Sequence, residues 1–489
     1  MKRPARTAIL AAALALSLTA AAAPPPGSAA ASPWSASALW DTWPSARVSG
    51  PDPWALKHAG LRAALDLLQA RQPGLFVVEQ EGVSSEGRKI PLLRLGSGPT
   101  GVLLWSQMHG DEPTATSALL DVLSWLGARR GNAAVEQLLS RLTIRIIPML
   151  NPDGAERTQR RTAEEIDINR DALRLSTPEG RFLKSVRDRT KPVAGYNLHN
   201  QGPNVAAGKG GEQVAISLLS VPGDEALSET EGTRRTKRLA AIVNSLVTPI
   251  APGRVARYDM DYTARAFGDS MTRWGTPTLL IETGGWAGPD EAARLVRLNF
   301  VALLGSLAAL ADGSVDQVDV ADYARIPLNT RDSLCALVVR GTRLATGRGL
   351  PPFTADLSFA VPGPFAGEAP RRREPGIVEV GDLAHLRGLA ELDATKLLAI
   401  PWPATEAPEE WTELQATLDS RGLVDASEAR LLAAVRALGE AAVARSGFAG
   451  PVLLYREGVD GKLTLAGAII RGRVVGEGLT PPLPSAPAK

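Results

Sequence analysis

The chain has 489 residues, a length that predicts about two or three domains. Apolar residues make up 44% and charged residues 22% of it, a balance that excludes a fibrous or mainly disordered protein. The formal net charge of +2 gives no electrostatic reason to expect a nucleic acid or an anionic membrane as partner. The one cysteine, Cys335, excludes an internal disulfide and a zinc site built from cysteines.

Residues 1–32 predict a secretory signal peptide with its linker, removed from the mature protein. Lys2, Arg3 and Arg6 precede a core rich in Ala and Leu, and small residues suited to cleavage follow. A membrane anchor is the alternative, but this apolar core is short for a span. Without the segment the chain has 51 basic and 52 acidic residues, so the positive charge belongs to the signal. We expect export to the periplasm or the medium, with no membrane span in the mature chain.

Residues 33–74 predict an N-terminal segment with a helix at 56–71. From 75 to 312, apolar strands alternate with helices. Strands are expected at 75–82, 90–96, 101–107, 141–150, 193–199 and 276–282, and helices at 113–127 and 291–310. This alternation predicts an α/β fold with a mixed, largely parallel sheet flanked by helices. Ligands of such sheets gather at the carboxyl ends of the strands.

After residue 313 the sequence predicts a smaller β-rich domain that extends to residue 479. A helix is expected within 425–446, capped by Asp425 or Ser427, and a hairpin within 451–472 with a turn at Asp460-Gly461. Residues 480–489 predict a disordered tail. No feature of this region indicates an obligate protein partner.

Polar residues follow four of the expected strands. His109 and Glu112 lie three positions apart in "HGDE", and His199 ends the strand at 193–199. Two histidines and a glutamate with one open position are the ligand pattern of a catalytic zinc. An arginine-rich loop, 151–171, follows the strand at 141–150, and Glu282 ends the strand at 276–282. Each feature alone is weak, since a lone histidine or glutamate at a strand end usually has a structural role, and only the joint pattern indicates a metal site.

The motifs "HGDE", "NPDG", "DINRD", "NLH" and "LLIETGG" together resemble the zinc carboxypeptidase family, the M14 metallopeptidases, over residues 75–312. The resemblance implies that Zn²⁺ is held by His109, Glu112 and His199. It implies that Glu282 is the general base, and that Arg160, with Arg161 as competitor, polarises the scissile carbonyl. It also implies that Asn169 and Arg170 grip the terminal carboxylate of the substrate.

We therefore expect an exported zinc carboxypeptidase that acts on peptides, or on peptidoglycan-derived peptides, with a free C-terminal carboxylate. A zinc-dependent deacylase of N-acyl amino acids on the same scaffold is one alternative, and a catalytically inactive binding module is another. The sequence leaves open whether Tyr258, Tyr262 or Arg265 contacts the substrate.

Overall fold

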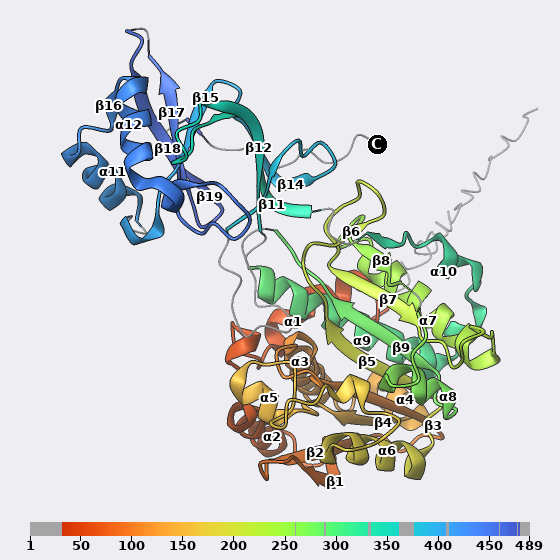
Figure 1. Ribbon diagram of the computed structural model, residues 1–489. Helices are drawn as coiled ribbons and strands as arrows, with labels where there is room; N and C mark the ends of the chain where they lie inside the picture. Colours follow the sequence, from red (N-terminus) through yellow and green to blue (C-terminus); the bar gives the residue numbers. More distant parts are fainter. Residues whose placement is uncertain are drawn as a thin grey trace, which may run out of the picture.

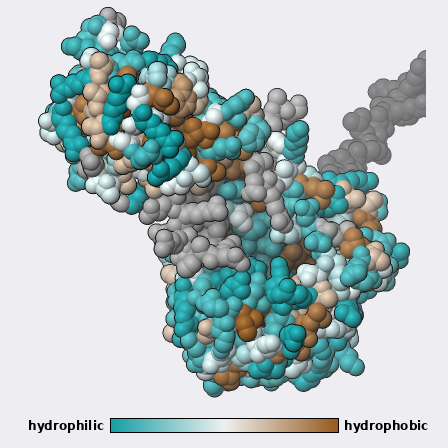
Figure 2. Space-filling model, viewed as in Figure 1, coloured by the Kyte–Doolittle hydropathy of each residue, from teal (hydrophilic) through white to brown (hydrophobic). Residues whose placement is uncertain are grey.

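The computed structural model describes residues 32–259, 261–287, 290–330, 334–360, 376–406, 410–458, 460–476 and 478–479. Nearly all of the expected signal segment and the whole expected tail lie outside these residues. The described chain forms two β-sheets, each with its own helices. In Figure 1 the first occupies the red-to-green part of the chain and the second the teal-to-blue part. The visible surface of both is mostly hydrophilic, with apolar residues in small patches (Figure 2).

The first sheet is mixed, with a parallel centre. Its eight strands are ordered β1 (Val77–Val83), β2 (Lys89–Leu95), β4 (Leu142–Ile147), β3 (Thr100–Ser106), β5 (Ala194–Asn200), β9 (Thr278–Thr283), β7 (Ile216–Ser220) and β8 (Val255–Arg257). Strands β4, β3, β5 and β9 are parallel, whereas β2 and β7 run antiparallel to their neighbours in this group. The predicted mixed, largely parallel sheet is confirmed.

Two features of this sheet place functional groups at one edge. The four parallel strands all end on the same side, so the loops that follow them meet there. The chain also passes from β3 to a neighbour on one side, β4, and then to a neighbour on the other side, β5. Such a reversal of strand order leaves a crevice beyond the carboxyl ends of the two central strands, where ligands bind in open α/β sheets.

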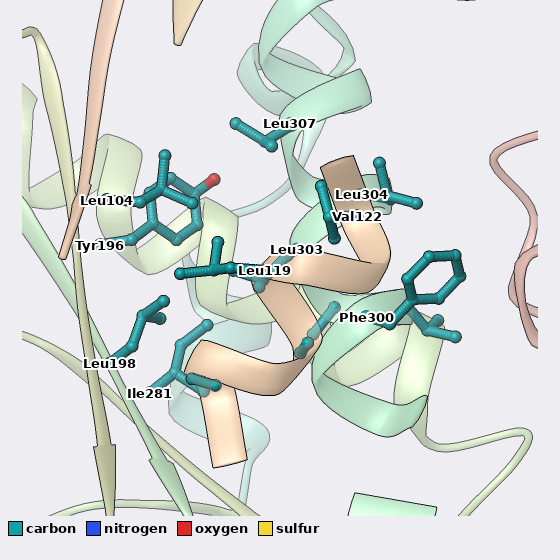
Figure 3. Close-up of a cluster of buried hydrophobic side chains, with 14 of the residues drawn as sticks. Leu104, Leu119, Val122, Tyr196, Leu198, Ile281, Phe300, Leu303, Leu304 and Leu307 are labelled. Carbon is teal, nitrogen blue, oxygen red and sulfur yellow. The ribbon is translucent and has the colours of Figure 1, made fainter. Parts of the chain in front are cut away.

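Helices cover both faces of the first sheet, as its alternating side chains require. Leu104 faces a cluster shared with α1 (Ala36–Ala46), α2 (His58–Arg71), α3 (Thr114–Ala128), α4 (Ala133–Arg141), α7 (Glu231–Val247) and α9 (Glu291–Asp312). Its neighbours Leu103 and Trp105 face the cluster formed with α6 (Pro178–Thr190) and α8 (Phe267–Arg273). Figure 3 shows the first cluster, where Leu104 and Leu198 of the sheet lie opposite side chains of α3 and α9. Both faces are therefore buried, which explains why these strands are continuously apolar.

Helix α9 is long and apolar enough to cross a membrane by length and composition. From the sequence we expected no such span in the mature chain. The structure accounts for this composition, because most of the helix is buried. Its residues Phe300, Leu303 and Leu307 belong to the core cluster of the first sheet. It is thus the central core helix of this layer.

The C-terminal region is β-rich, as predicted. Its nine-stranded sheet has the order β13 (Ile377–Gly381), β12 (Phe353–Phe359), β11 (Leu334–Leu344), β15 (Leu397–Pro401), β17 (Val452–Glu457), β18 (Leu463–Ile470) and β16 (Asp425–Ala426). Strand β14 (Arg387–Asp393) pairs with β11, and β19 (Arg473–Val475) pairs with β18. Helices α11 (Trp411–Ser420) and α12 (Glu428–Leu438) share an apolar cluster with this sheet.

The helix expected within 425–446 is shorter in the structure. Ser427 caps α12, and its side chain accepts a hydrogen bond from the Arg430 N–H. Asp425 is instead part of β16, where it pairs with Thr464. The helix ends at Leu438 because Gly439 follows with a φ of 54°, the left-handed region that favours glycine.

The chain between the two sheets packs on the first one, although its composition changes near residue 313. The short helices η3 (Ser314–Gln317) and α10 (Ala321–Arg325) contribute Val315 and Tyr323 to the core cluster of the first sheet. Strand β10 (Asn329–Thr330) pairs with β6 (Ala206–Ala207), in the loop that follows β5. From the C-terminal sheet, the guanidinium of Arg387 donates to the carbonyls of Gly210 and Gly211 in that same loop.

A buried acid lies at the start of α6. Thr177 caps this helix, and Glu179 follows with 0% of its surface exposed. Its Oε1 accepts the Ser85 N–H at 3.2 Å, while its Oε2 has no hydrogen-bond partner among the described residues. Burial raises the pKa of Glu179 to about 7 from an ordinary value of 4.5. The folded chain therefore holds a proton on this group that the unfolded chain releases.

This difference predicts a pH dependence of stability. At Glu179 the folded state binds more protons than the unfolded state between pH 4.5 and about 7, so the contribution of this group to the free energy of unfolding falls as the pH rises through that window. Glu179→Gln removes the effect. Its unfolding free energy relative to wild type should rise with pH across the window, by up to about 3 kcal/mol. Urea unfolding at pH 4.5 and pH 8 measures this. Glu225→Gln, at an exposed position, is the control and should have the unfolding free energy of wild type at both pH values. If Glu179→Gln also had the unfolding free energy of wild type at both pH values, the prediction would be wrong.

Candidate active site

The turn after β3 carries the "HGDE" motif into the crevice. Gln107 has a φ of 51°, and its side-chain amide donates to the Gly110 carbonyl at 2.9 Å, which closes the turn. Gly110 lies against the backbone of Gly154, in the first turn of α5 (Pro152–Arg157). A Cβ at position 110 would come within 2.0 Å of the Gly154 carbonyl carbon. Glycine is therefore required here, because the two loops touch through their backbones.

His109, Glu112 and His199 converge in the structure. The Nδ1 atom of His109 lies 2.7 Å from Glu112 Oε1, and the Nδ1 atom of His199 lies 2.6 Å from Glu112 Oε2. Each of the three residues is only 2% exposed, and their ligand atoms all lie within 4.8 Å of one another. The structure thus brings together the three ligands that the sequence predicted, from two separate segments.

Their surroundings fit a zinc ion. The Nε2 atom of His109 faces Asp167 Oδ1 at 3.1 Å, which directs the Nδ1 atom of the same ring toward Glu112. Carboxylates commonly orient zinc-binding histidines in this way. The Asn200 N–H donates to Glu112 Oε2 at 3.1 Å, and the Asn200 side chain donates to Thr114, so this asparagine holds the glutamate through its backbone. Two imidazoles and one carboxylate form a set of donors typical of catalytic zinc.

The cluster buries the Glu112 carboxylate against two imidazoles and the Arg160 guanidinium. Burial opposes ionisation of Glu112, but His109 and His199 hold the pKa of its carboxyl well below its usual range. Burial lowers the pKa of His199. Burial also disfavours the charged form of His109, but the Glu112 and Asp167 carboxylates together outweigh it and raise the pKa of His109 to about 9. A buried anion with such partners is the environment that a divalent cation neutralises.

Arg160 is the arginine that reaches this cluster. Its Nη1 lies 3.0 Å from His109 Nδ1 and 3.3 Å from Glu112 Oε1, and its Nε and Nη2 contact Asp167 Oδ2 at 3.1 and 3.0 Å. Arg161 instead donates from its Nη1 to the Glu165 carbonyl at 3.1 Å. Of the two arginines that the sequence offered, the structure therefore places Arg160 beside the predicted ligands.

Asn169 and Arg170 lie in the same loop, on the short helix η2 (Ile168–Arg170). Asp167 caps this helix by accepting the Asn169 N–H at 2.8 Å. The Asn169 Oδ1 accepts the Phe267 N–H at 2.9 Å, which ties the helix to the start of α8. The Arg170 side chain is exposed and lines a cavity of about 470 Å³ together with six other residues, among them Arg160 and Asp167. This cavity thus borders the ligand cluster.

Glu282 is the residue before the last of β9, at the same edge of the sheet. It is directly paired with His199 of the neighbouring parallel strand, so the two side chains leave the sheet on the same face. Glu282 is partly exposed. The register therefore places a carboxylate beside the metal-ligand candidates, as the sequence led us to expect.

The remaining histidines and one of the tyrosines lie elsewhere. His58 contacts the Lys89 carbonyl through its Nε2 at 2.8 Å, and the exposed His385 lies 4.0 Å from Glu379. Tyr258 packs against the small apolar cluster that includes Leu219. Sequence reasoning missed one residue, Asp167, which contacts both His109 and Arg160. Asp167 could have been found from its position, because it stands two residues before Asn169 in the motif "DINRD".

Residues 61–199 match the model of the family described as zinc carboxypeptidase. A probable carboxypeptidase 2 of Trichophyton verrucosum is 32% identical over 131 residues, which are 25% of this chain and 25% of that protein. Carboxypeptidase E of Caenorhabditis elegans is 30% identical over 141 residues, 24% of this chain and 30% of that protein. The resemblance to zinc carboxypeptidases is confirmed. The chain spans about a quarter of the length of the curated relatives it matches.

Solved structures give similar matches. A metallo-carboxypeptidase from Pseudomonas aeruginosa in complex with (2-guanidinoethylmercapto)succinic acid is 19% identical, with a TM-score of 0.42, and the match covers 52% of this chain and 68% of that chain. A metallo-carboxypeptidase from Burkholderia cenocepacia is 20% identical, with a TM-score of 0.42, over 52% of this chain and 69% of that chain.

The contact between Asp167 and His109 predicts a role in metal affinity. Asp167→Asn keeps the shape but weakens the hold on the His109 ring, so the dissociation constant for Zn²⁺ should rise about 10- to 100-fold. Competition with a fluorescent chelator measures this directly. Asp188→Asn, on the exposed side of α6, is the control and should match wild type. Equal affinities for wild type and Asp167→Asn would show that Asp167 does not support the metal.

Proposed function

We propose that this chain, whose residues 61–199 match the zinc carboxypeptidase family, is an exported zinc-dependent metallocarboxypeptidase. Its substrates would be peptides, including peptidoglycan-derived peptides, with a free C-terminal carboxylate. The observation that carries the proposal is the buried convergence of His109, Glu112 and His199 at the carboxyl edge of the sheet. The expectation of export rests on the sequence of residues 1–32.

Three of the chain's residues would hold the metal. Zn²⁺, when bound by His109, Glu112 and His199, supplies a Lewis acid that polarises a carbonyl and makes a water molecule more acidic. The Asp167 contact keeps the His109 ring in the orientation that binding needs. Because Glu112 accepts the Asn200 N–H, its carboxylate is also held in place before a metal arrives.

Glu282 would carry the proton. A carboxylate within one hydrogen bond of the attacking water can accept its proton and later return it to the leaving amine. The pairing of Glu282 with His199 supports this role, because it fixes the side chain on the face where the ligands meet. Its partial exposure leaves room for water to approach.

Arg160 would stabilise the negative charge that develops on the carbonyl oxygen. Its guanidinium is anchored by two contacts to Asp167 and lies beside the ligand cluster. A fixed donor aimed at a developing oxyanion contributes about 3 kcal/mol to transition-state stabilisation. Burial disfavours the Arg160 charge, but Glu112 and Asp167 outweigh it and raise the pKa of this residue, so it remains a cation.

Asn169 and Arg170 would bind the C-terminal end of the substrate, so that the enzyme removes the last residue of a peptide. A guanidinium binds both oxygens of a carboxylate through its planar fork. Arg170 stands in the cavity that borders the cluster, and η2 holds it at a set position there. A peptide whose terminal carboxylate meets Arg170 would present its last amide bond to the metal site.

The experiment that tests the proposal is mass-spectrometric product analysis on paired peptides that differ only at the C-terminus. The zinc-loaded protein should release the last residue from the free acid and leave the amidated peptide intact, since the amide offers Arg170 no charge. A chelator should abolish the release. Equal cleavage of both peptides would contradict the carboxypeptidase role. Release of the acyl group from N-acyl amino acids, without peptide cleavage, would favour the deacylase alternative.

Glu282→Gln tests the proton carrier. The variant keeps the shape of the side chain but cannot accept a proton, so kcat/KM should fall at least about 10³-fold while zinc content stays the same. Glu225→Gln, an exposed change away from the site, should retain wild-type activity. If wild type and Glu282→Gln were both inert yet bound peptide equally, the chain would be a binding module on this fold.

A further inference from the structure

Two arginines in the cavity beside the ligand cluster have no acidic partner. Arg160 contacts Glu112 and Asp167, and Arg161 also has its interactions within the chain. By contrast, neither Arg170 nor Arg265 forms an ion pair with any carboxylate in the described part of the chain. Both side chains are exposed, and both line the cavity of about 470 Å³. The cavity therefore presents two guanidinium groups that no carboxylate of the described residues holds in an ion pair, although the charges of Asp167 and Asp269 act on Arg170 from farther away.

The backbone fixes these two residues close together. The Ala172 N–H donates to the Arg265 carbonyl at 3.1 Å, and the Phe267 N–H donates to Asn169 Oδ1 at 2.9 Å. The two hydrogen bonds join the loop that carries Arg170 to the segment that carries Arg265. They are made by residues on both sides of Arg170, namely Asn169 and Ala172. The fold thus sets the positions of the two backbones, from which both side chains reach the same cavity.

The other charges of the cavity do not cancel this pair. Its lining contains four arginines and two acids, Glu165 and Asp167, and Asp167 is engaged by Arg160 and His109. Asp269, a further acid in the first turn of α8, does not line the cavity. It is buried, and its Oδ1 accepts the Thr263 N–H at 3.0 Å. The surplus is positive, so the cavity suits a ligand with more than one negative charge.

We propose that Arg265 binds the side-chain carboxylate of the substrate's C-terminal residue, so the enzyme prefers peptides that end in an acidic amino acid. This inference rests on the proposed carboxypeptidase function. In that function the terminal carboxylate meets Arg170, which leaves Arg265 for a second anion. A dicarboxylic residue carries both anions on one short unit, and each matches the planar fork of one guanidinium. A basic C-terminal residue would be repelled by Arg265.

A matched set of peptides tests this preference. The peptides are identical except for their last residue, which is Glu, Gln, Leu or Lys, and kcat/KM is measured for each with zinc-loaded protein. Wild type should favour Glu over Gln about 10- to 100-fold, as expected for a charged hydrogen bond lost with the isosteric amide. Two further peptides end in Asp or in diaminopimelate. A comparison of their kcat/KM values shows whether the second carboxylate comes from an ordinary acidic peptide or from a wall-derived one.

Substitutions of Arg265 provide the decisive comparison. Arg265→Ala should reduce the Glu-to-Gln ratio to about 1, and Arg265→Glu should favour Lys. Arg174→Ala is the control, because Arg174 is exposed in the same loop as Arg170 but does not line the cavity, and it should keep the wild-type ratio. A gain in the release of C-terminal Lys by Arg265→Glu would also show that this variant is folded.

The outcomes separate the two proposals. A wild-type ratio near 1, or a ratio that Arg265→Ala leaves unchanged, overturns the acidic preference while chelator-sensitive release of Leu keeps the carboxypeptidase function. Absence of zinc-dependent release from every peptide overturns the carboxypeptidase function, and the acidic preference with it.

Discussion

The burial of the Glu112 carboxylate between two imidazoles is the interaction on which the site depends. An isolated carboxylate at 2% exposure would be costly, and this one is offset by His109, His199 and the Asn200 N–H. These partners come from β5 and from the turn after β3, so the arrangement exists only when those strands are adjacent and in register. The parallel centre of the sheet is therefore a requirement of the site as well as of the core.

Much of this could be read from the sequence. The apolar strands and the 3.6-residue spacing of the helices predicted the α/β layer, because both faces of a parallel sheet must be covered. The ligand residues were predictable because each stands at the end of a strand or just after one, where the fold class itself brings strand ends together. The pairing of His199 with Glu282 needed no more than the two strands being neighbours.

Other features depend on contacts that no short window of sequence contains. The choice between Arg160 and Arg161 is made by the path of one loop, in which Thr158 and Glu165 both adopt positive φ values. Asp167 was missed because the group it orients, His109, is 58 residues away. The sequence placed a boundary near residue 313, and beyond it Val315 and Tyr323 pack into a core whose other members lie far back along the chain. Local composition could not show that.

The backbone contact between Gly110 and Gly154 has a consequence for anyone who would move this centre to another protein. The "HGDE" turn supplies ligands and the "NPDG" segment, where α5 (Pro152–Arg157) begins, supplies none, yet the two lie so close that only glycine fits at position 110. The two motifs are therefore packed against each other through their backbones. A transplanted centre would need both turns at the same separation, and a scaffold given only the histidines and the glutamate would lack the surface that shapes their loop.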